Sequence, residues 1–162
     1  MNKSIEQWLN EYGESHQNPI NKVIHWICVP LIMLSLLALI GQIPFFTNKL
    51  ILFHIGSEPI TLNWTILFLI FSVIFYLRLS LTLSIGMMLI AFSMLYLISY
   101  IRYYDSEVWR LSLIIFIIAW IGQFIGHKIE GKKPSFFEDL QFLLIGPAWL
   151  LSFIYNKLGI KL

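Results

Sequence analysis

Long apolar runs separated by short polar stretches make up most of the chain. Between Lys22 and Lys49 only His25 ionises near neutral pH, and four later stretches contain no charged side chain. A helix needs roughly 17–25 mostly apolar residues to cross a bilayer. The pattern predicts an all-α integral membrane helical bundle with four firm transmembrane helices, followed by a fifth segment that Gly146-Pro147 breaks. The expected segments are Val23–Ile43, Ile60–Leu77, Leu79–Ile101, Leu111–Gly126 and Leu140–Tyr155.

An amphipathic pattern precedes the first apolar run. Ser4 is a suitable N-cap, and Ile5, Trp8, Leu9 and Tyr12 follow it with the spacing of one helix face. Such a helix suits the headgroup region of a membrane. The alternative is a frayed polar tail, because the apolar stripe covers only two helical turns.

Composition supports a membrane protein and excludes several other classes. The 162 residues are 58% hydrophobic and 12% charged, with a mean hydropathy of +0.77, whereas soluble domains carry about 25% charged residues. This excludes an ordinary soluble enzyme, a disordered chain and a nucleic-acid binder, which needs a concentrated basic surface. Cys28 is the single cysteine, so neither an intrachain disulfide nor a cysteine-based zinc site is possible. We expect one membrane-embedded domain over residues 1–162.

The five expected segments divide the positive charges almost equally between the two membrane faces. The N-terminal face has six Lys and Arg residues and the opposite face has five. This small excess only slightly favours a cytoplasmic location for the N-terminus and for His25. A capping-box pattern at Ser135–Glu138 predicts the start of the last helix. The N-terminal face collects Lys3, Lys22, Arg78, Lys128, Lys132 and Lys133, and the opposite face collects Lys49, Arg102, Arg110, Lys157 and Lys161.

Two polar clusters fall on the same face in this topology. His16 and His25 enter the first crossing, and Gln123, His127 and Glu130 leave the fourth with i, i+4, i+7 spacing on one helix face. Imidazole and carboxylate side chains on facing helices hold divalent metals in helical bundles. With no thiolate available, ferrous iron, manganese or zinc would suit the site.

Simpler interpretations of the same residues stay open. Glu130 can instead form an ion pair with a neighbouring lysine on a solvated rim, and a lone interfacial histidine is often only a boundary residue. Asn18 and Asn21 can cap the first crossing helix or hydrogen-bond the histidines. His54 falls on the opposite face, where a structural role is expected.

Both clusters resemble the motifs of a known family. His16–His25 followed by Pro30, and Trp120–Gly131 followed by Pro134, resemble the two motifs of the fungal 2-hydroxy-fatty-acid dioxygenase family. The resemblance implies a non-haem iron(II) enzyme of internal membranes that uses O₂ to shorten long-chain 2-hydroxy fatty acids by one carbon, a step of alpha-oxidation. The membrane would be the bacterial inner membrane, or the endoplasmic reticulum in a eukaryote.

The resemblance also implies roles for individual residues. His16, His25 and His127 match the metal-binding histidines, with Glu130 as a fourth ligand or a base, and Gln123 as the side chain that orients substrate or oxygen. Two other classes stay open, a membrane lipid-binding scaffold without turnover and a metal-dependent lipid hydrolase or hydroxylase. Oligomeric state and acyl-chain length do not follow from the sequence. The candidate substrate-binding residues are Asn18, Asn21, Lys22 and Lys128.

Overall fold

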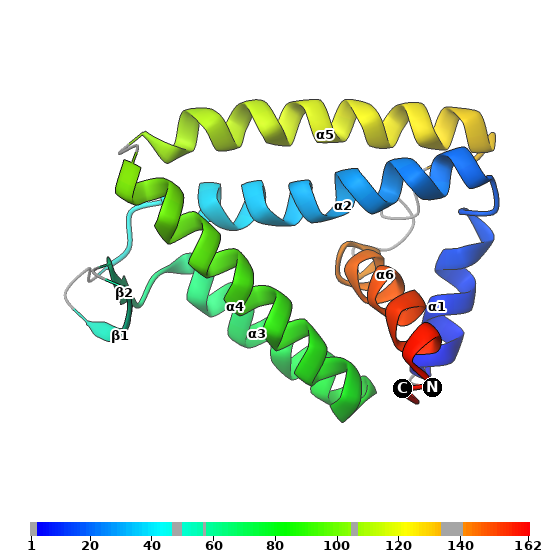
Figure 1. The fold of residues 1–162 in the computed structure, drawn as a ribbon, viewed down its shortest axis with the longest axis horizontal. Helices are drawn as coiled ribbons and strands as arrows, with labels where there is room; N and C mark the ends of the chain where they lie inside the picture. The colour runs from blue at the N-terminus through cyan, green and yellow to red at the C-terminus, as the bar shows by residue number, and fades with distance from the viewer. Residues whose placement is uncertain (1–2, 47–49, 57, 105–106, 134–140) are drawn as a thin grey trace.

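The computed structural model of the chain describes residues 3–46, 50–56, 58–104, 107–133 and 141–162. Within these residues the fold consists of helices and one small antiparallel hairpin (Figure 1). The helical class predicted from the sequence is confirmed, and the hairpin is an addition to it. In chain order the elements are α1 (Ile5–Glu14), α2 (Pro19–Ile40), β1 (Ile51–Ile55), β2 (Glu58–Thr61), α3 (Trp64–Leu79), α4 (Leu81–Tyr104), α5 (Val108–Glu130) and α6 (Phe142–Leu158).

Three helices, α2, α4 and α5, are long and apolar enough to cross a membrane. Helices α3 and α6 are apolar but have only 16 and 17 residues. The second expected crossing is shorter than predicted because Ile60 pairs in β2 and the Asn63 side chain caps α3 by accepting from the Ile66 amide. Four firm crossings are therefore not confirmed.

Helix α6 differs from the broken segment that the sequence predicts. It runs as one helix through Gly146 and Pro147, so the prediction of a break at this pair is wrong. The capping box expected at Ser135–Glu138 lies outside the described residues. The N-cap position of α6 is Gln141.

Helices α2 and α5 lie side by side along the long axis of the molecule, and α3 and α4 form a second pair joined at Ser80 (Figure 1). Two glycines on α5 permit the close approach to α2. A Cβ atom at Gly122 would lie 2.6 Å from the Cys28 sulfur, and one at Gly126 would lie 2.3 Å from the Asn21 side-chain oxygen. Small residues are what allow the backbones of apolar helices to come together.

Helix α1 begins with the expected cap, because the Ser4 hydroxyl accepts from the Gln7 amide. The apolar side chains of α1 were expected to face lipid headgroups, but in the structure they contact other helices. Trp8 and Tyr12 are buried in one cluster with Phe142, Ile145 and other residues of α6. The stripe therefore packs against protein.

Both chain ends lie at the same end of the molecule (Figure 1). Leu162 packs against the apolar cluster that contains Ile5, together with Tyr76 and Leu83 from the two sides of the α3–α4 turn. A fifth crossing would separate the ends of the chain. The structure instead places the last residue of the chain beside the first helix.

Candidate metal centre

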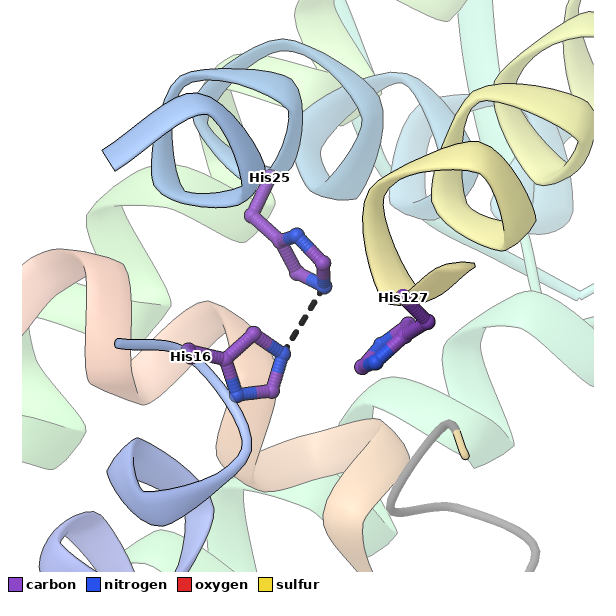
Figure 2. Close-up of side chains that lie close together, drawn as sticks. All are labelled: His16, His25 and His127. Atoms are coloured by element: carbon purple, nitrogen blue, oxygen red, sulfur yellow. Dashed lines mark hydrogen bonds between the residues drawn. The ribbon is translucent and has the colours of Figure 1, made fainter. Parts of the chain in front are cut away.

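Three histidines from distant parts of the sequence point toward one another (Figure 2). His16 lies in the turn after α1, His25 in the second turn of α2, and His127 in the last turn of α5. Each offers one ring nitrogen, and these three atoms all lie within 4.8 Å of one another. The side chains are 0%, 1% and 4% exposed, respectively, so the group is shielded from solvent.

The C-cap of α1 and the N-cap of α2 fix the turn that carries His16. Helix α1 ends at the C-cap Ser15, and the His16 amide donates to the Gly13 carbonyl. Helix α2 then begins at once, because the Asn18 side chain accepts from the Ile20 amide and Pro19 occupies the first helical position. The short connection leaves the His16 ring facing the two helices beside it.

The two hydrogen bonds made by the Nδ1 atoms fix the tautomers of His16 and His25. His16 Nδ1 lies 2.6 Å from the Tyr12 carbonyl, and His25 Nδ1 lies 2.9 Å from the Asn21 carbonyl. Because a carbonyl oxygen only accepts, both Nδ1 atoms carry a hydrogen. In a neutral imidazole the remaining nitrogen, Nε2, then presents a lone pair. Metal-ligating histidines commonly have this second hydrogen bond.

The two Nε2 atoms lie 2.9 Å apart, along the dashed line of Figure 2. A hydrogen bond between them needs a proton on one, which would make that ring an imidazolium. Burial opposes this charge and lowers the pKa of His16 to about 4, so the ring is neutral near pH 7. Two lone pairs facing each other repel, and a bound cation turns this repulsion into attraction.

The third histidine completes a site that suits a divalent metal. The His127 ring centroid lies 5.0 Å from those of His16 and His25, and its buried Nδ1 has no hydrogen-bond partner among the described residues. Two nitrogens bound at about 2.1 Å to one ion and at right angles are about 3.0 Å apart, close to the observed 2.9 Å. Imidazole donors suit iron, copper, nickel and zinc, which leaves the metal's identity to experiment.

Glu130 lies outside this group of ligand atoms. Its carboxylate accepts from the Gln17 amide at 2.8 Å, from the Asn18 amide at 2.9 Å and from the Asn21 side-chain nitrogen at 2.9 Å. Within the described residues it forms no ion pair with a lysine. Glu130 therefore ties the end of α5 to the turn that carries His16.

The other candidate residues divide between the site and the surface. Gln123 lies one turn before His127 and is buried, and both side chains line a small cavity of about 60 Å³. Asn18 and Asn21 are engaged in the hydrogen bonds of the turn. Lys22 is partly exposed and Lys128 is exposed, and neither lines this cavity. His54, in β1, is exposed and lies at the opposite end of the molecule.

Comparison with known proteins agrees with the two-motif resemblance. The family model described as "2-hydroxy-palmitic acid dioxygenase Mpo1-like" matches residues 2–158, which include all three histidines. The chain belongs to the Mpo1-like family. A curated relative, the 2-hydroxy-palmitic acid dioxygenase MPO1 of Saccharomyces cerevisiae, is 28% identical over 157 residues, 96% of this chain and 82% of the relative. No solved structure matches the chain at a significant level.

In this Mpo1-like chain two aromatic residues complete the centre, and sequence reasoning did not place them there. The Tyr12 ring stacks on His16 with centroids 4.2 Å apart and an angle of 14°, and Trp149 lies 5.2 Å from the same ring. Gly146 makes room, because a Cβ atom there would lie 2.9 Å from the Tyr12 hydroxyl. The available signal was spacing, since Tyr12 is one helical turn before His16.

Proposed function

We propose that this Mpo1-like protein is an iron(II)-dependent dioxygenase that shortens 2-hydroxy fatty acids by one carbon with O₂. One observation carries the proposal, namely the convergence of three buried imidazoles, two of which, His16 and His25, have Nδ1 hydrogen bonds that direct their Nε2 lone pairs toward each other. The name of the yeast relative supports the substrate class. Neutral imidazole ligands that leave other positions open are typical of O₂-activating ferrous centres.

The reaction balances without any further reductant. A 2-hydroxy acid, R–CH(OH)–COOH, and O₂ give R–COOH, CO₂ and H₂O. The bond between C1 and C2 breaks, and the four electrons that O₂ accepts all come from these two carbons. An iron ion held by His16, His25 and His127 would supply the redox chemistry that a reaction with O₂ requires.

The chain's own residues provide the ligands and a shielded cavity. His16, His25 and His127 would hold the metal. The Gln123 amide, in the same cavity as His127, would orient the polar head of the substrate or O₂. Tyr12 and Trp149 limit the access of water to His16.

Surface charge has a separate role in bringing the substrate to the site. Lys22 is partly exposed near the start of α2 and Lys128 is exposed near the end of α5, beside the histidines. We propose that both attract the carboxylate as it approaches, through a long-range effect that weakens with salt.

The proximity of the chain ends supports a membrane orientation. With Lys157 and Lys161 on the N-terminal face, that face carries eight of the eleven Lys and Arg residues, and the opposite face carries Lys49, Arg102 and Arg110. Positive charge gathers on the cytoplasmic face of membrane proteins. We propose that the N-terminus and the metal centre face the cytoplasm, in a bacterial inner membrane or the endoplasmic reticulum.

The experiment that tests the function compares two histidine variants. Wild type, His127→Ala and His54→Ala are purified anaerobically in mild detergent, analysed for metals, and given 2-hydroxyhexadecanoic acid and O₂. We expect about one iron per chain and a C15 acid from wild type and from the control His54→Ala, and neither from His127→Ala.

Other outcomes would change the assignment in defined ways. Zinc in place of iron, with turnover that is indifferent to O₂, would indicate a metal-dependent lipid hydrolase. Absence of both metal and turnover in folded wild type would leave a lipid-binding scaffold. Equal iron in His127→Ala and wild type would contradict the proposed ligand set.

A further inference from the structure

A large, mostly apolar groove lies between α2, α3, α4 and α6. Its volume is about 780 Å³, and aliphatic and aromatic side chains such as Leu36, Phe68, Leu69 and Leu144 form most of its wall. This volume is within the range of about 300–1,000 Å³ typical of sites for small organic ligands. The groove is therefore large enough for a long hydrocarbon chain.

The groove adjoins the small cavity of the metal centre. The two spaces share four wall residues, Ile32 and Met33 from α2 and Leu143 and Pro147 from α6. All four are apolar, so only uncharged side chains separate the two spaces. From Gln123 and His127 outward, the small cavity is thus followed by an apolar neck and then by a groove whose wall is mostly apolar, with Lys3 and Arg78 also among its lining residues.

We propose that the groove binds the acyl chain of the 2-hydroxy acid, with its carboxyl and hydroxyl groups at the histidines. This inference rests on the proposed function and adds to it the path of the substrate. The tail passes between Met33 and Leu143 and lies along α3. Gln123 and His127 in the small cavity would then face the polar head of the substrate, and the mostly apolar wall of the groove would face its tail.

The size of the small cavity favours a single-chain acid over a bilayer phospholipid. The roughly 60 Å³ beside His127 accommodates about four or five water-sized groups. The two carbons and three oxygens at the head of a 2-hydroxy acid are of this size. A glycerophosphate headgroup with two acyl chains is much larger, so a phospholipid cannot place its head at the histidines.

Photolabelling tests the path without requiring turnover. Two 2-hydroxyhexadecanoic acids, with a diazirine near C4 or at the tail end, are added anaerobically to the full-length protein in nanodiscs. We expect the C4 probe to label the segments around Gln123 and Leu143, and the tail probe to label α3 around Phe68–Val73. Excess 2-hydroxy acid should compete, and excess phosphatidylcholine should not. Tail labelling confined to the outward-facing residues of α4 and α5, or competition by the phospholipid, would overturn the proposal.

A pair of variants on α4 tests the same path through chain-length preference. Ala91 lines the groove, whereas Ser93 on the same helix is exposed and does not. Each buried methylene contributes about fourfold to affinity, so Ala91→Phe, which excludes about three of them, should weaken C16 binding by roughly sixtyfold. Ala91→Phe should bind C10 acids with the affinity of wild type. Ser93→Phe should change the affinity for neither C16 nor C10 acids. An equal effect of Ala91→Phe on both chain lengths would contradict the assignment.

The two proposals fail in different ways. If no product forms but the tail probe labels α3, the protein binds the acid in the groove and the dioxygenase assignment is wrong. If C15 acid forms while the probes label other segments and Ala91→Phe has no chain-length effect, the dioxygenase assignment stands and the groove is not the binding site.

Discussion

Replacing Gly126 by alanine should disturb the metal centre through a residue that is not itself a ligand. The added methyl group would lie 2.3 Å from the Asn21 side-chain oxygen and 3.4 Å from Ile24, well inside van der Waals contact with the first. Asn21 is 0% exposed, so its amide cannot swing into solvent. It has to move within the α2–α5 interface, away from its 2.9 Å bond to Glu130.

The expected magnitude follows from these two contacts. Inserting a methyl group into a packed interface costs about 1–3 kcal/mol, and losing a hydrogen bond to a charged group costs about 1.5–3 kcal/mol. Since part of each cost relaxes, we expect about 2–4 kcal/mol of destabilisation. Glu130 also holds the turn that carries His16, so iron affinity should fall about 10- to 100-fold, as when other groups that orient a ligand are removed.

Gly122→Ala is the matched control, because it adds the same methyl group one turn earlier on α5. Its Cβ atom would lie 2.6 Å from the Cys28 sulfur, away from the turn. Thermal unfolding in detergent should show a lower Tm for both variants, and anaerobic iron titration should show weaker binding only for Gly126→Ala. If both variants bind iron with the same affinity, the coupling of Gly126 to the centre through Asn21 is refuted.

Three further predictions concern the same contacts. Glu130→Gln removes the charge and one of the acceptor oxygens of the turn, so iron affinity in a titration should fall about tenfold or more; an unchanged affinity would contradict a positioning role. Tyr76→Phe removes the hydroxyl that donates to the Leu144 carbonyl at 2.7 Å. Unfolding should become easier by about 1 kcal/mol with iron content unchanged, and a loss of iron would show that the effect is not local. Anaerobic iron(II) should raise the Tm of wild type by mass action but not that of His25→Ala; an equal rise in both would mean that iron binds elsewhere.

The sequence predicted that the histidines reach the same face from the expected topology, and their convergence depends in addition on how the helices pack. Four crossings were expected between the residues before His25 and those after His127, which would return both to the same face, and in the structure the paired helices α2 and α5 bring them together. The helical spacing of Glu130 predicted that it would lie beside His127, but it did not predict its hydrogen-bond partners. It shares a helix face with His127, but it is the last residue of α5 and meets the free backbone amides of the next turn.

Hydropathy did not distinguish the alternatives that the structure resolves. The apolar residues around Ile51 and Ile60 belong to a hairpin whose turn contains Gly56 with φ of +61°, and short apolar runs do not separate strand from helix. Nor does an apolar run of 17 residues indicate which surface it packs against, and in the structure α6 packs against α1. The packing of α6 depends on contacts with Trp8 and Tyr12 of α1, which are distant in sequence.

The three histidines also determine when a metal can be bound during synthesis. His25 and His127 are 102 residues apart, so translation at about 5–20 residues per second separates their appearance by roughly 5–20 s. An ion held by both closes a loop of about 100 residues, which in a chain-entropy treatment of such cross-links stabilises the folded state by up to about 5 kcal/mol. With the proposed metal bound, loading of the complete site would follow the synthesis of α5, and the ion would join the first helices of the chain to α5.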